Sequence, residues 1–334
     1  MHEVRIEHPH NEASALVAIH DHALLDALGF DVAFWIASDE KPAREAIAAL
    51  GRTKDGGDWS VAQLTTKRGT SWTGKPAEDC ETIARAGAWI YVFGSQFGSK
   101  KGILEPKRHF VIRFNESQVR EMEVEVDLAR APFVLHRLIN DALHARNIEL
   151  IARNDDFIEN TRKLARSKKK TWRKLVQKDD HPINVEGAAF LPNGHLLLGL
   201  RYPSTAKGQP ILVEVERIDA LFEGEEPRVA SGWVIENAGA ADAPAGVREL
   251  DSRGAAIHVI TGELDNPGVP TGARNEHIVV HVPKRRSRKV MHLKAKRVRK
   301  LARGSNVEGL AVQDDGRVWY VHDDEQIRLG VAKL

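Results

Sequence analysis

The feature that most constrains this sequence is a motif that recurs four times at nearly constant spacing. Residues 306–311 read Asn-Val-Glu-Gly-Leu-Ala, and residues 184–189 read Asn-Val-Glu-Gly-Ala-Ala. Each copy is followed by a turn containing glycine and then by an apolar run that ends in a polar residue. Looser copies centre on Glu81 and Arg248. From motif residue to polar end, the copies run from 81 to 95, 186 to 201, 248 to 263 and 308 to 323, separations of 14, 15, 15 and 15 residues that are typical of a repeat architecture.

Each copy of the motif has the pattern of a β-hairpin. A short apolar run is followed by a turn, such as Asn-Gly at 193–194, and then by a β-branched or aromatic run. In an antiparallel hairpin, the start of the first strand lies beside the end of the second. We therefore expect Glu186 to lie near Arg201, and Glu308 near Asp323.

Further strand-like runs follow each hairpin, so each unit is predicted to be a four-stranded meander. Such sheets arranged radially form a β-propeller, in which the first strand of each blade lines the central channel. The sequence predicts one all-β domain, 1–334, with about five blades, and a sixth stays open where the pattern is weakest. Residues 3–6 are expected to complete the last blade and close the ring.

One stretch, 131–177, has a helical pattern instead. Its apolar residues recur at intervals of three and four, with good helix formers between them. We predict a helical insertion between the second and third blades. It explains why Glu81 and Glu186 are 105 residues apart, whereas later copies are separated by 62 and 60 residues.

Composition excludes several classes of protein. Lys and Arg total 49 against 47 Asp and Glu, so the net charge of +2 gives no whole-protein case for binding nucleic acid. A single cysteine, Cys80, excludes an internal disulfide framework and a multi-cysteine zinc site. No basic leader runs into an apolar region, and no run of eighteen apolar residues occurs. The expectation is a cytoplasmic protein with no membrane partner.

The segments that carry these patterns lie outside the helical stretch. They are residues 34–40, 90–96, Arg108, 113–114, 184–187, 199–201, 246–250 and 306–311. Together they resemble a bacterial family of domains of unknown function that is expected to be propeller-like, and they are more distantly similar to esterase-like phytase domains. Two residues depart from the pattern, because Thr82 replaces glycine and Arg248 replaces glutamate. The resemblance implies a fold and names no reaction.

The polar ring at the channel mouth suggests a hydrolase acting on a small anionic substrate, with a phosphoester favoured over a lactone. Oxygen ligands suit Ca²⁺ or another divalent cation, which would activate water. Arginine side chains would hold the anion through forked hydrogen bonds. The predicted metal ligands are Glu81, Glu186, Glu308 and Asp39; the predicted catalytic residues are Glu186, Glu308 and Asp323; the predicted substrate-binding residues are Arg108, Arg201 and Arg248.

Two alternatives stay open for the same ring. It could bind a small anionic or polar ligand without turnover, as a ligand-binding or interaction scaffold. It could also be architectural, with each glutamate holding neighbouring blades in register through backbone N–H groups and an arginine. Arg248 breaks the repeat and faces carboxylates, which symmetry alone does not explain. Arg201 and Arg248 would also compensate the carboxylates, so that a metal is not required.

Two segments, 162–174 and 284–303, are strongly basic. Together they could bind a polyanion such as RNA or DNA. Aromatic residues are nearly absent from both, with Trp172 alone, which disfavours a platform for stacking single-stranded bases. A solvated outer face is the favoured interpretation, and nucleic acid is the less favoured partner.

Overall fold

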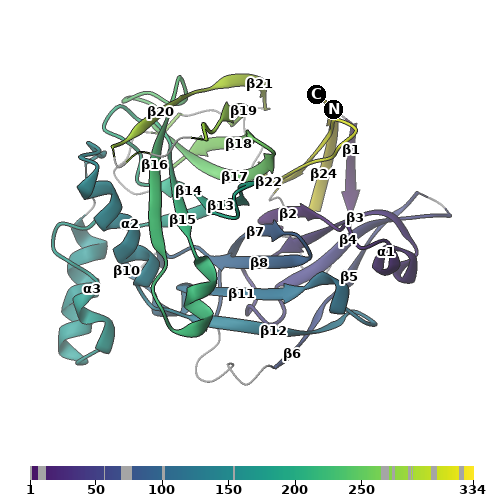
Figure 1. Cartoon of the computed structure of the whole chain (residues 1–334), viewed down its shortest axis with the longest axis horizontal. Helices are drawn as coiled ribbons and strands as arrows, with labels where there is room; N and C mark the ends of the chain where they lie inside the picture. Colours follow the sequence, from purple (N-terminus) through teal and green to yellow (C-terminus); the bar gives the residue numbers. More distant parts are fainter. Residues whose placement is uncertain are drawn as a thin grey trace.

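The strands of this protein form five radial sheets, which are the blades of a β-propeller (Figure 1). The computed structural model describes residues 2–6, 13–55, 57–68, 77–99, 102–152, 155–264, 271–272, 275–284, 287, 289–301, 307–322 and 327–334. Blade 1 contains β2 (Ala15–Ala18), β3 (Phe30–Ala37), β4 (Ile47–Thr53) and β5 (Trp59–Gln63). The five-bladed arrangement confirms the predicted fold.

Blades 2 to 4 each begin with one of the predicted hairpins. Blade 2 contains β7 (Cys80–Ala86), β8 (Trp89–Gly94), β11 (Phe110–Asn115) and β12 (Glu123–Arg130), with β6 (Thr65–Arg68) added in parallel beside β12. Blade 3 contains β13 (Asn184–Phe190), β14 (Leu196–Tyr202), β15 (Ile211–Glu216), β16 (Arg228–Glu236) and β20 (Met291–Lys294). Blade 4 contains β17 (Ala245–Arg253), β18 (Ala256–Glu263), β19 (Glu276–His281) and β21 (Lys296–Lys300).

Blade 5 is built from both ends of the described chain. It contains β22 (Val307–Val312), β23 (Arg317–His322) and β24 (Ile327–Lys333), and β1 (His2–Ile6) pairs antiparallel with β24. The predicted closure by the N-terminal strand is therefore confirmed. The innermost strands contact one another in the order β2, β7, β13, β17 and β22, and β22 contacts β2 again. The ring is thus closed around the channel.

Apolar and aromatic side chains pack between neighbouring blades. Trp35 and Phe114 meet edge to face across blades 1 and 2, with ring centroids 5.3 Å apart. Tyr91 and Phe190 lie 4.9 Å apart across blades 2 and 3. Each fully buried side chain of this size contributes about 1.5–3 kcal/mol relative to leaving it in water. The blades are therefore held side by side mainly by these interfaces, which position the ends of the inner strands.

The helical insertion lies where it was predicted, between blades 2 and 3. It contains α2 (Val134–Ala145), α3 (Asp155–Ser167) and the 3-10 turn η3 (Thr171–Lys174). Leu135, Ile139 and Leu143 of α2 pack into the apolar cluster of blades 2 and 3. Smaller elements are β9 (Gly98–Ser99) paired with β10 (Ile103–Leu104), and the 3-10 turns η1 (Pro106–Arg108), η2 (Glu116–Gln118) and η4 (Ile218–Glu223).

Two local features differ from the sequence prediction. Of the strand-like runs that follow the fourth hairpin, the one at 290–293 was expected to join blade 4, and this was wrong. It forms β20, which pairs in parallel with β16 of blade 3, and β21 is the outer strand of blade 4. A helix, α1 (His22–Leu28), was also missed inside the first hairpin of blade 1. Its N-terminus is capped by Asp21, whose side chain accepts a hydrogen bond from the Leu24 N–H.

Candidate functional site

Each of the four motif residues is the extra residue of a β-bulge near the start of an inner strand. The pairing with the neighbouring strand shifts across Glu81, Glu186, Arg248 and Glu308, between the residues on either side of each. A bulge interrupts the regular alternation of side chains and re-aims the extra one. The four β-bulges thus bring the four motif side chains to one end of the channel. We call this end the motif mouth.

Glycine follows the bulged glutamate in blades 3 and 5 because neighbouring atoms leave no room for a side chain. A Cβ at Gly187 would lie 2.8 Å from Leu250 Cγ, and one at Gly309 would lie 2.3 Å from Val321 Cγ1. The Glu-Gly pairs in the sequence therefore mark bulges.

A chain of ion pairs links three blades at the motif mouth. Glu186 pairs with Arg201, which confirms the predicted neighbourhood, and its other oxygen lies 3.4 Å from Arg248 Nε. Arg248 also pairs with Glu308 of blade 5. Glu186 and Arg248 are each only 4% exposed. Arg248, the residue that breaks the repeat, is thus the cation between two bulged glutamates.

A second cluster at the motif mouth contains Asp79, which the sequence analysis did not propose as a site residue. The Arg108 Nη1 atom lies 2.9 Å from Asp79 Oδ1, and the Ser95 hydroxyl donates a hydrogen bond to the same carboxylate. Asp79 has φ 74°, in the left-handed region that non-glycine residues rarely adopt. Such backbone strain commonly marks functional sites.

A repeated polar position could have identified Asp79. It precedes Glu81 by two residues, as Asn184 precedes Glu186. In blade 3 this Asn184 donates a hydrogen bond of 3.2 Å to Glu186. The position two residues before the motif residue is therefore part of the site in both blades.

The carboxyl groups of the motif mouth differ in their pKa values. Burial is the largest influence on Asp79 and raises its pKa to about 7, although the Arg108 charge and the Ser95 hydrogen bond lower it. Burial also raises the pKa of Glu81 well above its ordinary value, and the charges of Asp79 and Glu186 add to the effect. Smaller contributions from Asp39 and Glu308 show that these residues lie near Glu81 as well. Burial thus raises the pKa values of two neighbouring carboxyl groups at one mouth.

The predicted metal site has a different arrangement from the one expected. No group of three or more His, Cys, Asp or Glu side chains among the described residues is placed to hold a metal ion. Glu186 and Glu308 instead contact the guanidinium of Arg248. As these side chains lie, Glu186 and Glu308 are not arranged to hold Ca²⁺. Binding of a divalent cation by this protein stays a prediction. The predicted catalytic residue Asp323 lies outside the described residues.

A buried hydrogen bond crosses the inner strands below the motif mouth. Thr82 and Glu249 follow Glu81 and Arg248, at the positions where glycine stands in blades 3 and 5. The Thr82 hydroxyl donates to Glu249 Oε1 over 3.0 Å, and the Leu250 N–H donates to the same atom over 2.8 Å. Thr82 and Glu249 are fully buried. Thr82 and Glu249, which both stand where the repeat has glycine, are thus partners of each other.

We expect E249Q to be more stable than the wild type at pH 8 and about equally stable at pH 4. Burial raises the pKa of Glu249 well above its ordinary value. As pH rises above about 4.5, the unfolded carboxyl ionises while the folded one stays protonated, so the wild type loses up to about 1.4 kcal/mol per pH unit. Urea denaturation at both pH values measures this difference, with the exposed substitution E159Q as control. An unchanged difference between E249Q and wild type across this range would contradict the expectation.

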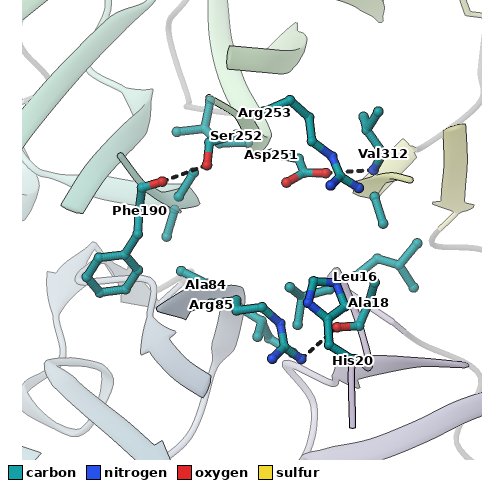
Figure 2. Close-up of a pocket in the computed structure, with 16 residues that line it drawn as sticks. Leu16, Ala18, His20, Ala84, Arg85, Phe190, Asp251, Ser252, Arg253 and Val312 are labelled. Carbon is teal, nitrogen blue, oxygen red and sulfur yellow. Dashed lines mark hydrogen bonds between the residues drawn. The ribbon is translucent and has the colours of Figure 1, made fainter. Parts of the chain in front are cut away.

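The opposite end of the channel, which we call the far mouth, contains a cavity of about 110 Å³. Residues from the later parts of all five inner strands line it, and Figure 2 shows Arg85, His20 and Arg253 around the opening. The sequence did not point to this cavity. Ala84, Ala189 and Ala311, which end three of the repeated motifs, line part of it, but its polar residues do not recur from blade to blade.

The two basic segments lie away from the mouths on other elements. The first covers the end of α3 and η3, and the second includes β20 and β21, the outermost strands of blades 3 and 4. Arg285, Arg286, Arg288 and Arg303 of the second segment lie outside the described residues. Nucleic-acid binding there stays a prediction. In the part of the chain that the structure covers, no helix is long and apolar enough to span a membrane.

Comparison with known proteins yields structural likeness only. No family model and no curated protein matches the chain. A structure called glucose dehydrogenase matches all of both chains at 10% identity, with a TM-score of 0.44. A putative gluconolactonase matches 99% of this chain and 91% of its own at 12% identity, with a TM-score of 0.37. A calcium structure of a Trichoderma reesei enzyme of carbohydrate-active family AA12 matches 100% of this chain and 95% of its own, at 10% identity and a TM-score of 0.40.

These likenesses are too weak to carry an argument about chemistry. The propeller assignment rests on the five sheets themselves. Membership in the bacterial family and the likeness to phytase domains stay predictions.

Proposed function

We propose that the motif mouth hydrolyses a small uncharged ester, lactones included, with Asp79 as the general base. The observation that carries this proposal is the pKa of about 7 at Asp79, in contact with Arg108 and Ser95. A general base works best when its pKa lies near the working pH. Glu81, whose pKa burial raises well above its ordinary value, supplies the matching acid. Two carboxyls whose pKa values are pushed apart by their surroundings are the usual arrangement for acid–base catalysis.

The proposed step balances without a further reactant. Asp79 takes a proton from water as the water oxygen forms a bond to the ester carbonyl carbon. When the bond from that carbon to the leaving oxygen breaks, Glu81 gives its proton to the leaving oxygen. A proton shift from Asp79 to Glu81 restores both groups. The products are a carboxylic acid and a hydroxyl group.

The charge balance of the motif mouth favours an uncharged substrate over the phosphoester that the sequence suggested. Each predicted substrate-binding arginine already pairs with a carboxylate. Among the described residues, the five carboxyl groups of this mouth outnumber its three guanidinium groups; they are those of Asp39, Asp79, Glu81, Glu186 and Glu308, against Arg108, Arg201 and Arg248. Ionisation of Asp79 adds a further negative charge to this group. An anion therefore meets no net attraction there.

The test is hydrolysis of a panel of neutral lactones and esters beside phosphate monoesters. We expect turnover of the neutral compounds, with kcat/KM rising as pH increases through about 7, where Asp79 becomes ionised. D79N should lower kcat/KM by about 10²–10⁴-fold without unfolding the protein. Dialysis against a chelator should leave the rate unchanged, since Arg248 occupies the glutamates that a cation would need.

Three outcomes would count against this assignment. Release of phosphate in preference to ester cleavage would support the phosphoester instead. Equal activity of D79N and wild type would remove Asp79 from the reaction. Saturable binding of the neutral compounds with no turnover would make the motif mouth a ligand-binding site. The exposed substitution E159Q serves as the control for handling and folding.

A further inference from the structure

The far mouth is a separate cavity at the other end of the channel from the motif mouth. Its volume of about 110 Å³ is several times the ~10–15 Å³ that a cavity needs to hold one water molecule. The cavity therefore has room for a small molecule. Polar side chains and backbone groups from different blades meet around it, as Figure 2 shows.

Of the two arginines that line the far mouth, Arg253 has the weaker ion pair within the protein. Its Nη1 atom lies 2.6 Å from Asp314 Oδ1, but the Asp314 side chain is 98% exposed to water. Exposed ion pairs of this kind contribute little. The Arg253 side chain is itself 28% exposed and lines the cavity. A ligand carboxylate can thus take the place of Asp314 on this guanidinium at little cost.

Arg85 has a different role at the same cavity. It donates to the Ala18 carbonyl over 2.7 Å and pairs with the buried Glu116. Its side chain is only 11% exposed. Arg85 is therefore a fixed part of the cavity wall, and its positive charge is already paired with the carboxylate of Glu116.

Asp251 places an acceptor beside Arg253. The two residues are separated by one position on β17, so their side chains leave the same face of the strand roughly 6.6 Å apart. Asp251 accepts a hydrogen bond of 2.6 Å from the Val312 N–H, and it keeps partial exposure to the cavity. Ser252 donates its hydroxyl proton to the Phe190 carbonyl over 2.6 Å. A cation and a hydrogen-bond acceptor are thus presented side by side.

We propose that the far mouth binds a small hydroxycarboxylate, whose carboxylate pairs with Arg253 and whose hydroxyl donates a hydrogen bond to Asp251. The guanidinium matches the planar carboxylate through two parallel hydrogen bonds. The cavity volume admits a ligand of a few carbon atoms. This site is inferred from the far mouth alone and does not depend on hydrolysis at the motif mouth.

The test is calorimetric titration of the full chain with lactate, propionate and lactamide. These probes carry both groups, the carboxylate alone, and the hydroxyl without the charge. We expect lactate to bind at about millimolar Kd or tighter, and the other two at least about tenfold more weakly, since each lacks a hydrogen bond to a charged group. R253Q should weaken lactate binding at least about tenfold. D251A removes the acceptor, so this variant should bind lactate and propionate with equal affinity.

Two further variants keep the test decisive. D314N removes only an exposed competitor for Arg253, so it should fold normally and bind lactate more tightly. R317Q removes a comparable surface arginine, paired with Asp315 at 2.6 Å, and should bind lactate as the wild type does. Failure of lactate to bind the wild type, or equal binding by R253Q and wild type, would overturn the proposal. An affinity for propionate equal to that for lactate would remove Asp251 from it.

Discussion

R248Q is expected to lower the free energy of unfolding by about 3–5 kcal/mol, because it removes the cation between two largely buried carboxylates. Glu186 keeps Arg201 as a partner, but Glu308 loses the guanidinium of Arg248. Removing one member of a buried ion pair leaves its partner charged and uncompensated, and that penalty exceeds the worth of the pair itself. Urea denaturation at neutral pH, followed by tryptophan fluorescence, measures the loss.

The matched control for R248Q is R317Q, which breaks an exposed pair and should cost less than about 1 kcal/mol. The double variant R248Q/E308Q should recover part of the loss, because it also removes the Glu308 carboxylate, which pairs with Arg248 in the wild type. If R248Q stays within about 1 kcal/mol of the wild type, the ring of glutamates does not depend on Arg248 for charge compensation.

E116A should also destabilise the protein by about 3–5 kcal/mol. The Glu116 carboxylate accepts hydrogen bonds from the Trp35 indole N–H at 2.7 Å and from two backbone N–H groups, those of His20 at 3.1 Å and Asp21 at 2.8 Å. It also pairs with Arg85 and is only 2% exposed. The substitution leaves four donors from blades 1 and 2 without their acceptor.

Thermal and urea unfolding of E116A, beside the exposed control E159A, measure this effect. Glu159 pairs with Lys163 one helical turn away, and both side chains are more than half exposed, so E159A should cost less than about 1 kcal/mol. Equal stability of E116A and E159A would show that blades 1 and 2 are held together without Glu116.

The repeat made most of the fold predictable. Constant spacing identified the hairpins, and the failure of that spacing between Glu81 and Glu186 identified the insertion. The position of β20 was not predictable, because an apolar run carries no information about which sheet edge it joins. The chain passes from the edge of blade 3 at β20 to the edge of blade 4 at β21 within a few residues.

The candidate site was predictable only in part. The motif residues identified the mouth, and the hairpin geometry predicted the contact between Glu186 and Arg201. The bulges were missed because register depends on the partner strand. Asp79 was missed because its pKa depends on burial and on Arg108, which is distant in sequence. The far mouth was missed because its polar residues, such as Arg85 and Arg253, do not recur from blade to blade.

The pairing of β1 with β24 constrains the order in which the protein can fold. Val4 lies opposite Leu329, so this contact joins segments at opposite ends of the described chain. Closing a long loop is entropically costly, and folding slows as contacts become more distant in sequence. During synthesis, the first strand must wait for its partner until almost every other strand has left the ribosome. Ring closure is therefore expected to be a late event in folding, and until then the edge of the incomplete blade is open to pairing with other chains.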